Sequence, residues 1–205
     1  MYSVKQGLIL GFHGCDKKIS HKILLGIEDL KASSNEYDWL GHGIYFWDNS
    51  PSRAFEYASF LKNNPSRSKN PILIPSVIGA AISLGVCLDL LDYSNLSLLR
   101  ESYDFVEQHY KQTNTAIPQN HNIGANTDLL LRKLDGTVIE NLHRMRVKLD
   151  LPPFDSVRGV FWEGNELYPN AGFREKDHIQ LCIRNPNCIK GYFLPRKYNE
   201  NFNRV

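Results

Sequence analysis

The sequence predicts one α+β domain, residues 1–205, built around mixed or antiparallel β-sheet with flanking helices. A length of 205 residues suits a single domain. Apolar runs typical of strands alternate with helical periodicity in the first half of the chain, whereas strand follows strand in the last third. A parallel, doubly wound sheet needs a helix between successive strands, so the last third argues against that architecture.

The composition excludes several classes of protein. Hydrophobic residues make up 42% of the chain and charged residues 22%, which is typical of a globular domain and excludes collagen, coiled coil and wholesale disorder. Lysine and arginine number 24 against 22 acidic residues, so the net charge of +2 is too small for a dedicated binder of polyanions. Any contact with nucleic acid must therefore come from a local patch.

The first half of the chain alternates strands and helices. A short apolar run at Gly7–Phe12 predicts a buried strand, and apolar residues recur at helical spacing over Ile19–Leu30. Gly43–Phe46 predicts a second strand. The Ser50–Pro51 pair combines an N-cap with a proline suited to the first helical position, so we expect a helix to begin there.

The remaining segments complete the predicted sheet. Pro71–Leu88 carries no charge, but prolines and glycines interrupt it, so we interpret it as two buried strands and not as a membrane span. Leu98–Lys111 and Val138–Leu149 each place apolar residues on one face of a helix. Three further strands are predicted near residues 157–162, 178–183 and 188–194.

The cysteines and the N-terminus bear on the compartment. Cys15, Cys87, Cys182 and Cys188 contain no CxxC pair, so the spacing favours free thiols over a zinc site or a thioredoxin-like motif. Free thiols fit a reducing compartment. Met1–Phe12 lacks the pattern of a secretory signal. We therefore expect a cytoplasmic protein that needs no metal and no membrane.

Residues suited to ligand binding gather in two segments. Phe12-His13-Gly14 ends the first strand, and residues 40–49 place glycines beside histidine and aromatic side chains, with Tyr57 following. Such glycines cost stability unless something approaches the backbone closely. Planar aromatic rings suit a planar ligand, and His13 suits a bond to a hydroxyl group. These residues predict a nucleotide or nicotinamide site, although Trp47, like Trp162 later in the chain, is interpreted as a packing anchor.

The order of these segments resembles the diphtheria-toxin and poly(ADP-ribose) polymerase branch of the ADP-ribosyltransferases. The resemblance lies in a strand ending in His13-Gly14, in the segment Gly43-Ile44-Tyr45-Phe46, and in a second tyrosine one helix length later at Tyr57. Gly11–Cys15 and Leu40–Tyr57 are its most specific parts. It implies a split sheet with a cleft that binds NAD+ as the substrate, without a metal.

The resemblance also implies roles for individual residues. His13 would bind a ribose hydroxyl, and the backbone of Gly14 would pair with the nicotinamide carboxamide. Tyr45 and Tyr57 would stack around the nicotinamide ring, with Phe46 as a further cofactor-binding residue. His13 and Tyr45 would belong to the catalytic set.

The third catalytic position departs from the family pattern. The family has a glutamate on a late strand, sometimes replaced, and here Gln180 lies in the matching kind of strand while Glu175 lies in the turn before it. Cleavage of the glycosidic bond builds positive charge on the ribose, which a glutamate offsets and a neutral glutamine does not. Both residues stay open, with Gln180 preferred because it lies inside the strand. Gln180 favours transfer of a single ADP-ribose over chain growth.

The expected function is ADP-ribosyl transfer to a macromolecular acceptor, either nucleic acid or protein. The near-neutral charge does not choose between them. By analogy, a small transferase of this kind is expected to be an intracellular bacterial toxin or phage-defence effector with a neutralising antitoxin partner. The turn at residues 163–176 would face the acceptor. An NAD+ glycohydrolase and a non-catalytic NAD- or nucleic-acid-binding module are the alternatives.

Overall fold

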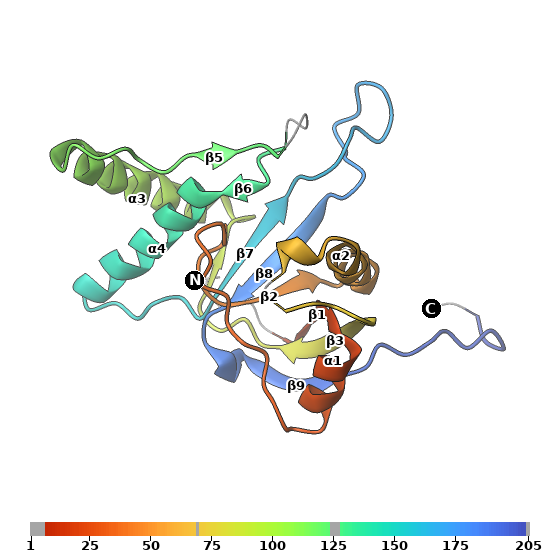
Figure 1. Cartoon of the computed structure of the whole chain (residues 1–205). Coiled ribbons are helices and arrows are strands. Elements are labelled where there is room, and N and C mark those ends of the chain that lie inside the picture. The colour runs from red at the N-terminus through yellow and green to blue at the C-terminus, as the bar shows by residue number, and fades with distance from the viewer. Residues whose placement is uncertain (1–6, 69, 124–127, 204–205) are drawn as a thin grey trace.

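The computed structural model describes residues 7–68, 70–123 and 128–203 (Figure 1). Within them, seven strands form one sheet. In sheet order they are β4 (Cys87–Asp89), β7 (Ser156–Phe161), β8 (His178–Ile183), β2 (Ile44–Asp48), β1 (Ile9–Asp16), β3 (Pro75–Ile82) and β9 (Ile189–Phe193). Met1–Gln6, the first part of the expected non-secretory N-terminus, lies outside the described residues.

Helices and short elements complete the described chain. β5 (Asn120–His121) and β6 (Leu131–Arg132) form a separate two-stranded sheet. The α-helices are α1 (Lys17–Leu24), α2 (Pro51–Asn63), α3 (Tyr93–Gln112) and α4 (Lys133–Lys148), and short 3-10 helices cover Pro65–Arg67 and Pro186–Cys188. β4 pairs in parallel with β7, whereas the other strands of the large sheet pair antiparallel. The predicted α+β class with a mixed sheet is therefore confirmed.

Within the large sheet, the stretch of pairing between neighbouring strands is shortest at the junction of β1 and β2. These strands pair only at Gly11↔Asp48 and Phe12↔Trp47, whereas β1 pairs with β3 from Ile9 to Asp16. The expected split into two sheets is thus corrected to one hydrogen-bonded sheet with a short junction. The strands on either side of that junction are paired over longer stretches.

The two faces of the sheet have different cores. Ile44 and Phe46 of β2 lie in a core with Ile23 of α1. The alternate residues Tyr45 and Trp47 lie in the opposite face, with clusters that include residues of α4 and α2. Figure 1 shows α2 over the middle of the sheet and the α3–α4 pair beyond its β4–β7 edge.

Three helix boundaries differ from the prediction. α3 begins at Tyr93, before the predicted start at Leu98. α1 ends at Leu24 and not near Leu30, because Gly26 has a φ of +67° and turns the chain away from helical geometry. α4 begins at Lys133, before the predicted start at Val138. Asn120 Oδ1 accepts from the backbone N–H of residues 134 and 135 at 2.9 and 3.3 Å, so a residue distant in sequence caps this helix.

The uncharged segment and the cysteines take the predicted states. Pro71–Leu88 contributes β3 and the start of β4. Cys15, Cys87, Cys182 and Cys188 are buried, and none of the four forms a disulfide. Of the helices that the structure describes, none is both long and apolar enough to cross a membrane.

Candidate functional site

His13 bridges the two strands where their pairing ends. Its Nδ1 lies 2.8 Å from the main-chain oxygen of Tyr45. A carbonyl oxygen only accepts, so Nδ1 carries the proton and Nε2 presents a lone pair. The ring meets Phe46 edge-on, with centroids 6.0 Å apart. Burial lowers the pKa of His13, which keeps the imidazole neutral at pH 7.

The main chain of Gly14 lies beyond the β1–β2 ladder. The N–H of Asn49 donates to Leu10 O at 2.8 Å, so Leu10 and every second residue after it direct their N–H and C=O groups towards β2. Gly14 is one of these residues, but the pairing ends before it. If the same register continued, Gly14 would lie opposite Tyr45, but the Tyr45 carbonyl is bound by His13. The peptide edge of Gly14 therefore faces β2 without a partner in the described ladder.

Gly14 also has a packing role. A Cβ at this position would lie 2.1 Å from the carbonyl oxygen of Ala54 in α2 and 3.2 Å from the Ala58 methyl group. The sequence predicts that something approaches the backbone at this glycine closely. In the structure, α2 makes that approach.

Tyr45 and Phe46 are held by the protein itself. The Tyr45 hydroxyl donates to Gly41 O at 2.8 Å and accepts from the Leu40 N–H at 3.0 Å. Burial raises the pKa of Tyr45. Phe46 is completely buried. The Tyr45 hydroxyl thus fixes the turn before β2, and Phe46 supports the His13 ring from the core.

A row of rings crosses the face of the sheet between α4 and α2. We name Trp39, Phe161, His178, Trp47 and Tyr57 the aromatic row. Successive centroids are 5.1, 5.4, 6.1 and 5.2 Å apart. Tyr57, the member on α2, is 37% exposed, whereas Trp47 is buried. The row thus brings β7, β8, β2 and α2 together on one surface of the sheet.

Gln180 is anchored to the aromatic row. The indole N–H of Trp39 donates to Gln180 Oε1 at 2.6 Å. Gln180 faces Gly159 of β7 and Trp47 of β2 across the sheet. A Cβ on Gly159 would lie 2.8 Å from the Trp39 ring, so the glycine allows the indole to lie over β7. The structure therefore gives the preferred third residue a fixed position.

Arg132 caps the Trp39 end of the row. Its guanidinium carbon lies 4.2 Å from the Phe161 centroid and 4.9 Å from the Trp39 centroid. Its Nε donates to Leu129 O at 2.8 Å. Burial lowers the pKa of Arg132, although the guanidinium stays charged. The Arg132 guanidinium and the Gln180 side chain both contact Trp39, so one side chain separates this positive charge from Gln180.

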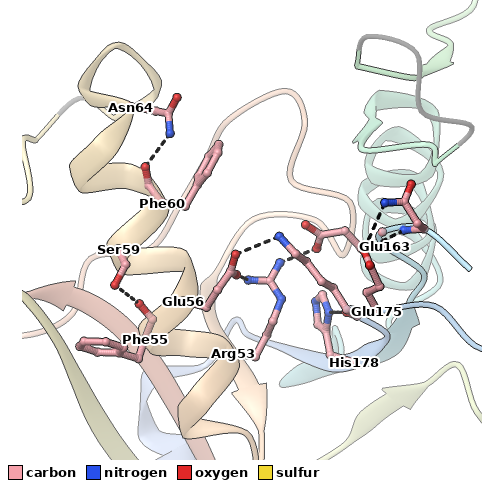
Figure 2. A network of polar contacts seen from close by, with 12 residues as sticks. Arg53, Phe55, Glu56, Ser59, Phe60, Asn64, Glu163, Glu175 and His178 are labelled. Carbon is pink, nitrogen blue, oxygen red and sulfur yellow. Dashed lines mark hydrogen bonds and ion pairs between the residues drawn. The ribbon is translucent and has the colours of Figure 1, made fainter. Parts of the chain in front are cut away.

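Glu175 lies apart from the row. Its carboxylate accepts from the backbone N–H and the side-chain amide of Asn165, each at 3.3 Å, inside the turn. Figure 2 shows Glu175 on the turn side of the polar network. Of the two candidates for the third position, Gln180 lies in the sheet between β7 and β2, whereas Glu175 stays in the turn.

Two ion pairs tie the turn at residues 163–177 to α2, and we name them the clasp. Arg53 of α2 pairs with Glu163, and Lys176 pairs with Glu56 at 2.9 Å. Figure 2 shows Arg53 between Glu56 of its own helix and Glu163 of the turn. The guanidinium of Arg53 also lies over Trp47, 5.6 Å from the ring centroid. The clasp thus adjoins the aromatic row.

Three buried polar atoms beside the clasp have no partner among the described residues. They are Trp47 Nε1, Arg53 Nε and His178 Nε2. Buried polar groups are nearly always hydrogen-bonded, so each exception needs an explanation. Trp47 contacts both other side chains. These atoms mark the part of the site where a polar group from outside the chain would find partners.

The sequence did not reveal half of this arrangement. Trp39, Arg132 and Phe161 carried no recognisable signal, and His178 was seen only as part of a strand. Trp47 was expected to be a packing anchor, and its burial in a core cluster agrees with that role. The same expectation for Trp162 is wrong, because its side chain is 56% exposed. A cavity of about 310 Å³ between α3 and α4 shares Trp39 with the row but contains none of the expected site residues.

Comparison with known proteins yields one similar chain. The sequence is 27% identical over 200 residues to the uncharacterized protein MJ0359 of Methanocaldococcus jannaschii, covering 87% of this chain and 83% of that protein. No family model and no solved structure matches the chain. The similarity spans most of both proteins, and the name of the relative assigns no activity.

Proposed function

We propose that the protein is an ADP-ribosyltransferase, which cleaves NAD+ and joins one ADP-ribose to a macromolecular acceptor. One observation carries the proposal. The sheet order β8-β2-β1 places Gln180, Tyr45 and His13 on adjacent strands, although they are far apart in sequence. The strands also part at His13, where the resemblance requires the substrate to enter.

The groups left unbound at the junction suit nicotinamide riboside chemistry. The lone pair on His13 Nε2 accepts a hydrogen bond from a ribose hydroxyl. The peptide edge of Gly14 offers one donor and one acceptor, which matches the oxygen and the amino group of a carboxamide. Tyr57 supplies an accessible ring for stacking.

Gln180 suits a single transfer. Its oxygen already accepts one bond from Trp39, which leaves a second lone pair and the amide N–H groups for the ribose. A neutral amide orients the sugar but does not balance the charge of the oxocarbenium-like transition state. We therefore propose single transfer without chain growth. A toxin or phage-defence effector, restrained by an antitoxin, is the role that we propose for such chemistry.

The experiment measures nicotinamide release from NAD+ and follows adenylate-labelled NAD+ onto the protein and nucleic-acid fractions of a cell lysate. His13→Asn is the test variant, because its amide keeps a donor for Tyr45 O but removes the Nε2 lone pair. His21→Asn, at an exposed position of α1, is the matched control. We expect release and labelling by the native chain and the control, and neither by His13→Asn.

The other outcomes separate the alternatives. Release of nicotinamide with no label on either fraction would identify an NAD+ glycohydrolase. A folded native chain that binds NAD+ but releases no nicotinamide, with lysate present, would leave a binding module. Equal labelling by His13→Asn and the native chain would contradict the role given to His13.

A further inference from the structure

We propose that His178 takes the proton from the acceptor group that attacks the ribose. This inference rests on the proposed transferase function and names a catalytic residue that the resemblance does not provide. It starts from the buried, unpartnered Nε2 of His178.

The tautomer of His178 is fixed by its neighbour. Nδ1 lies 2.6 Å from the main-chain oxygen of Lys176, which only accepts, so Nδ1 carries the proton. Nε2 is consequently the basic nitrogen. The ring stacks on Phe161 at 5.4 Å with planes 25° apart, and it lies 6.1 Å from the Trp47 ring. These contacts fix the direction in which the lone pair points.

The other candidate groups are poor bases. Gln180 is an amide and takes no proton at neutral pH. Glu175 is engaged with Asn165 in the turn. In the proposed function, the Nε2 lone pair of His13 is already bound to a ribose hydroxyl. A transfer reaction still has to remove a proton from the incoming O–H or N–H group, and His178 is placed to do so.

His178 shares its face of β8 with Gln180. Residues two apart in a strand point to the same face and are about 7 Å apart. Gln180 orients the ribose in the proposed function, so a nucleophile approaching that sugar along β8 passes His178. Trp47 Nε1 and Arg53 Nε, the two other unpartnered atoms beside the clasp, are donors that would hold the same incoming group.

The charges around His178 keep it unprotonated. Burial lowers the pKa of His178, and Arg53 of α2 lowers it further, whereas the Lys176 carbonyl, Glu163 and Asp177 of the turn act in the opposite direction. Figure 2 shows the ring next to the Arg53–Glu163 pair. Because Nε2 is buried here, the acceptor reaches it when the turn moves away from α2 and the clasp opens.

The step balances without another reactant. The glycosidic bond of NAD+ breaks, and its electron pair passes to the ring nitrogen of nicotinamide, which leaves as a neutral molecule. A lone pair of the acceptor forms the new bond to the ribose carbon. The proton of that acceptor group passes to His178 Nε2, and the imidazolium then releases it to water.

The test compares acceptor labelling and NAD+ binding in His178→Asn and in a control variant. The asparagine amide keeps a donor for Lys176 O but has no basic nitrogen. We expect labelling of the lysate acceptor by His178→Asn to fall about 100-fold, while the folded variant binds NAD+ with the native affinity, because His178 acts on the acceptor group. His143→Asn is the control, because His143 is also a buried histidine with unpartnered ring nitrogens but lies on α4.

A pH profile gives a second readout that needs no variant. Native transfer should fall on the acid side, below the ordinary histidine value of about 6.5, and His143→Asn should show the same fall. Native labelling that rises as the pH falls below this value would overturn the inference. Unchanged labelling by folded His178→Asn would overturn it as well. Failure of the native chain to release nicotinamide would instead refute the proposed function beneath it.

Discussion

Gln180, the preferred candidate for the third position of the expected site, has its side-chain oxygen bound by the indole N–H of Trp39. The Trp39 indole N–H binds one lone pair of the Gln180 oxygen and fixes the orientation of the amide. A glutamine at this position is therefore stabilised by a hydrogen bond within the protein. A carboxylate would accept the same bond. The surroundings therefore tolerate either residue, and the neutral charge is a property of the residue itself.

Gly14 is the residue whose replacement should reveal most about packing. In Gly14→Ala the new methyl group would lie 2.1 Å from the Ala54 carbonyl oxygen, which is main chain and cannot rotate away. We expect α2 to shift and the free energy of unfolding to fall by about 1–3 kcal/mol. Urea denaturation followed by circular dichroism measures this loss.

Gly191→Ala in β9 is the matched control. A Cβ there has no neighbour within 4 Å. Its unfolding free energy should stay within about 0.5 kcal/mol of the native value. If Gly14→Ala were as stable as Gly191→Ala, the close packing of α2 on β1 would be refuted.

Among the elements, the turn at residues 163–177 depends most on a few polar contacts. Its own hydrogen bonds hold it together, and the clasp ties it to α2 (Figure 2). Lys176 and Glu56 are each about 40% exposed, so that pair contributes little. Arg53 and Glu163 are 12% and 20% exposed, so their pair is the stronger part of the clasp.

Glu163→Gln should therefore loosen the turn. The variant removes the carboxylate but keeps the side-chain volume, and Arg53 keeps Glu56 as a partner. We expect faster hydrogen exchange across residues 163–177 than in the native chain, with a smaller effect in β8. Hydrogen exchange read by mass spectrometry of peptides measures both regions.

Glu36→Gln is the control for this measurement. Glu36 pairs with Lys133, and its side chain is 81% exposed, so the loss of this pair should leave the stability nearly unchanged. Exchange in the turn should match the native chain. Unaltered exchange in the turn of Glu163→Gln would show that its ion pair does not hold the turn on α2.

At the scale of the whole molecule, buried histidines make stability depend on pH. Burial lowers the pKa of His143 to about 4, and burial also lowers the pKa values of His13 and His178. Between the lowered folded values and the ordinary value of about 6.5, the unfolded chain binds more protons. The stability that comes from keeping these histidines neutral should therefore be complete above about pH 6.5. The free energy of unfolding should fall as the pH decreases below that value.

Urea titrations at pH 7 and pH 5 check this dependence. His143 alone should account for a loss of about 2 kcal/mol over that interval. His143→Leu removes the titrating ring and its unpartnered nitrogens, so its loss should be smaller by that amount. Equal losses in the native chain and His143→Leu would mean that His143 does not remain neutral in the folded protein.

Local patterns were sufficient to predict most elements. Apolar periodicity identified the strands that became β1, β2, β3, β8 and β9, and the Ser50–Pro51 pair located the start of α2. The start of α4 could not be predicted in this way, because the capping oxygen belongs to Asn120 and is brought there by the β5–β6 pair. The short β1–β2 junction likewise depends on how two distant segments pair.

The sequence by itself determined the α+β class, the positions of most strands, and the segments that contain His13, Tyr45 and Gln180. These depend on side-chain periodicity and turn residues, which are local properties. Only the tertiary structure decided that Phe46 is core, that Glu175 stays in its turn, and that Trp39 contacts both Gln180 and Arg132. The physical reason is that burial and hydrogen-bond partners depend on segments far apart in the chain, which a local pattern does not contain.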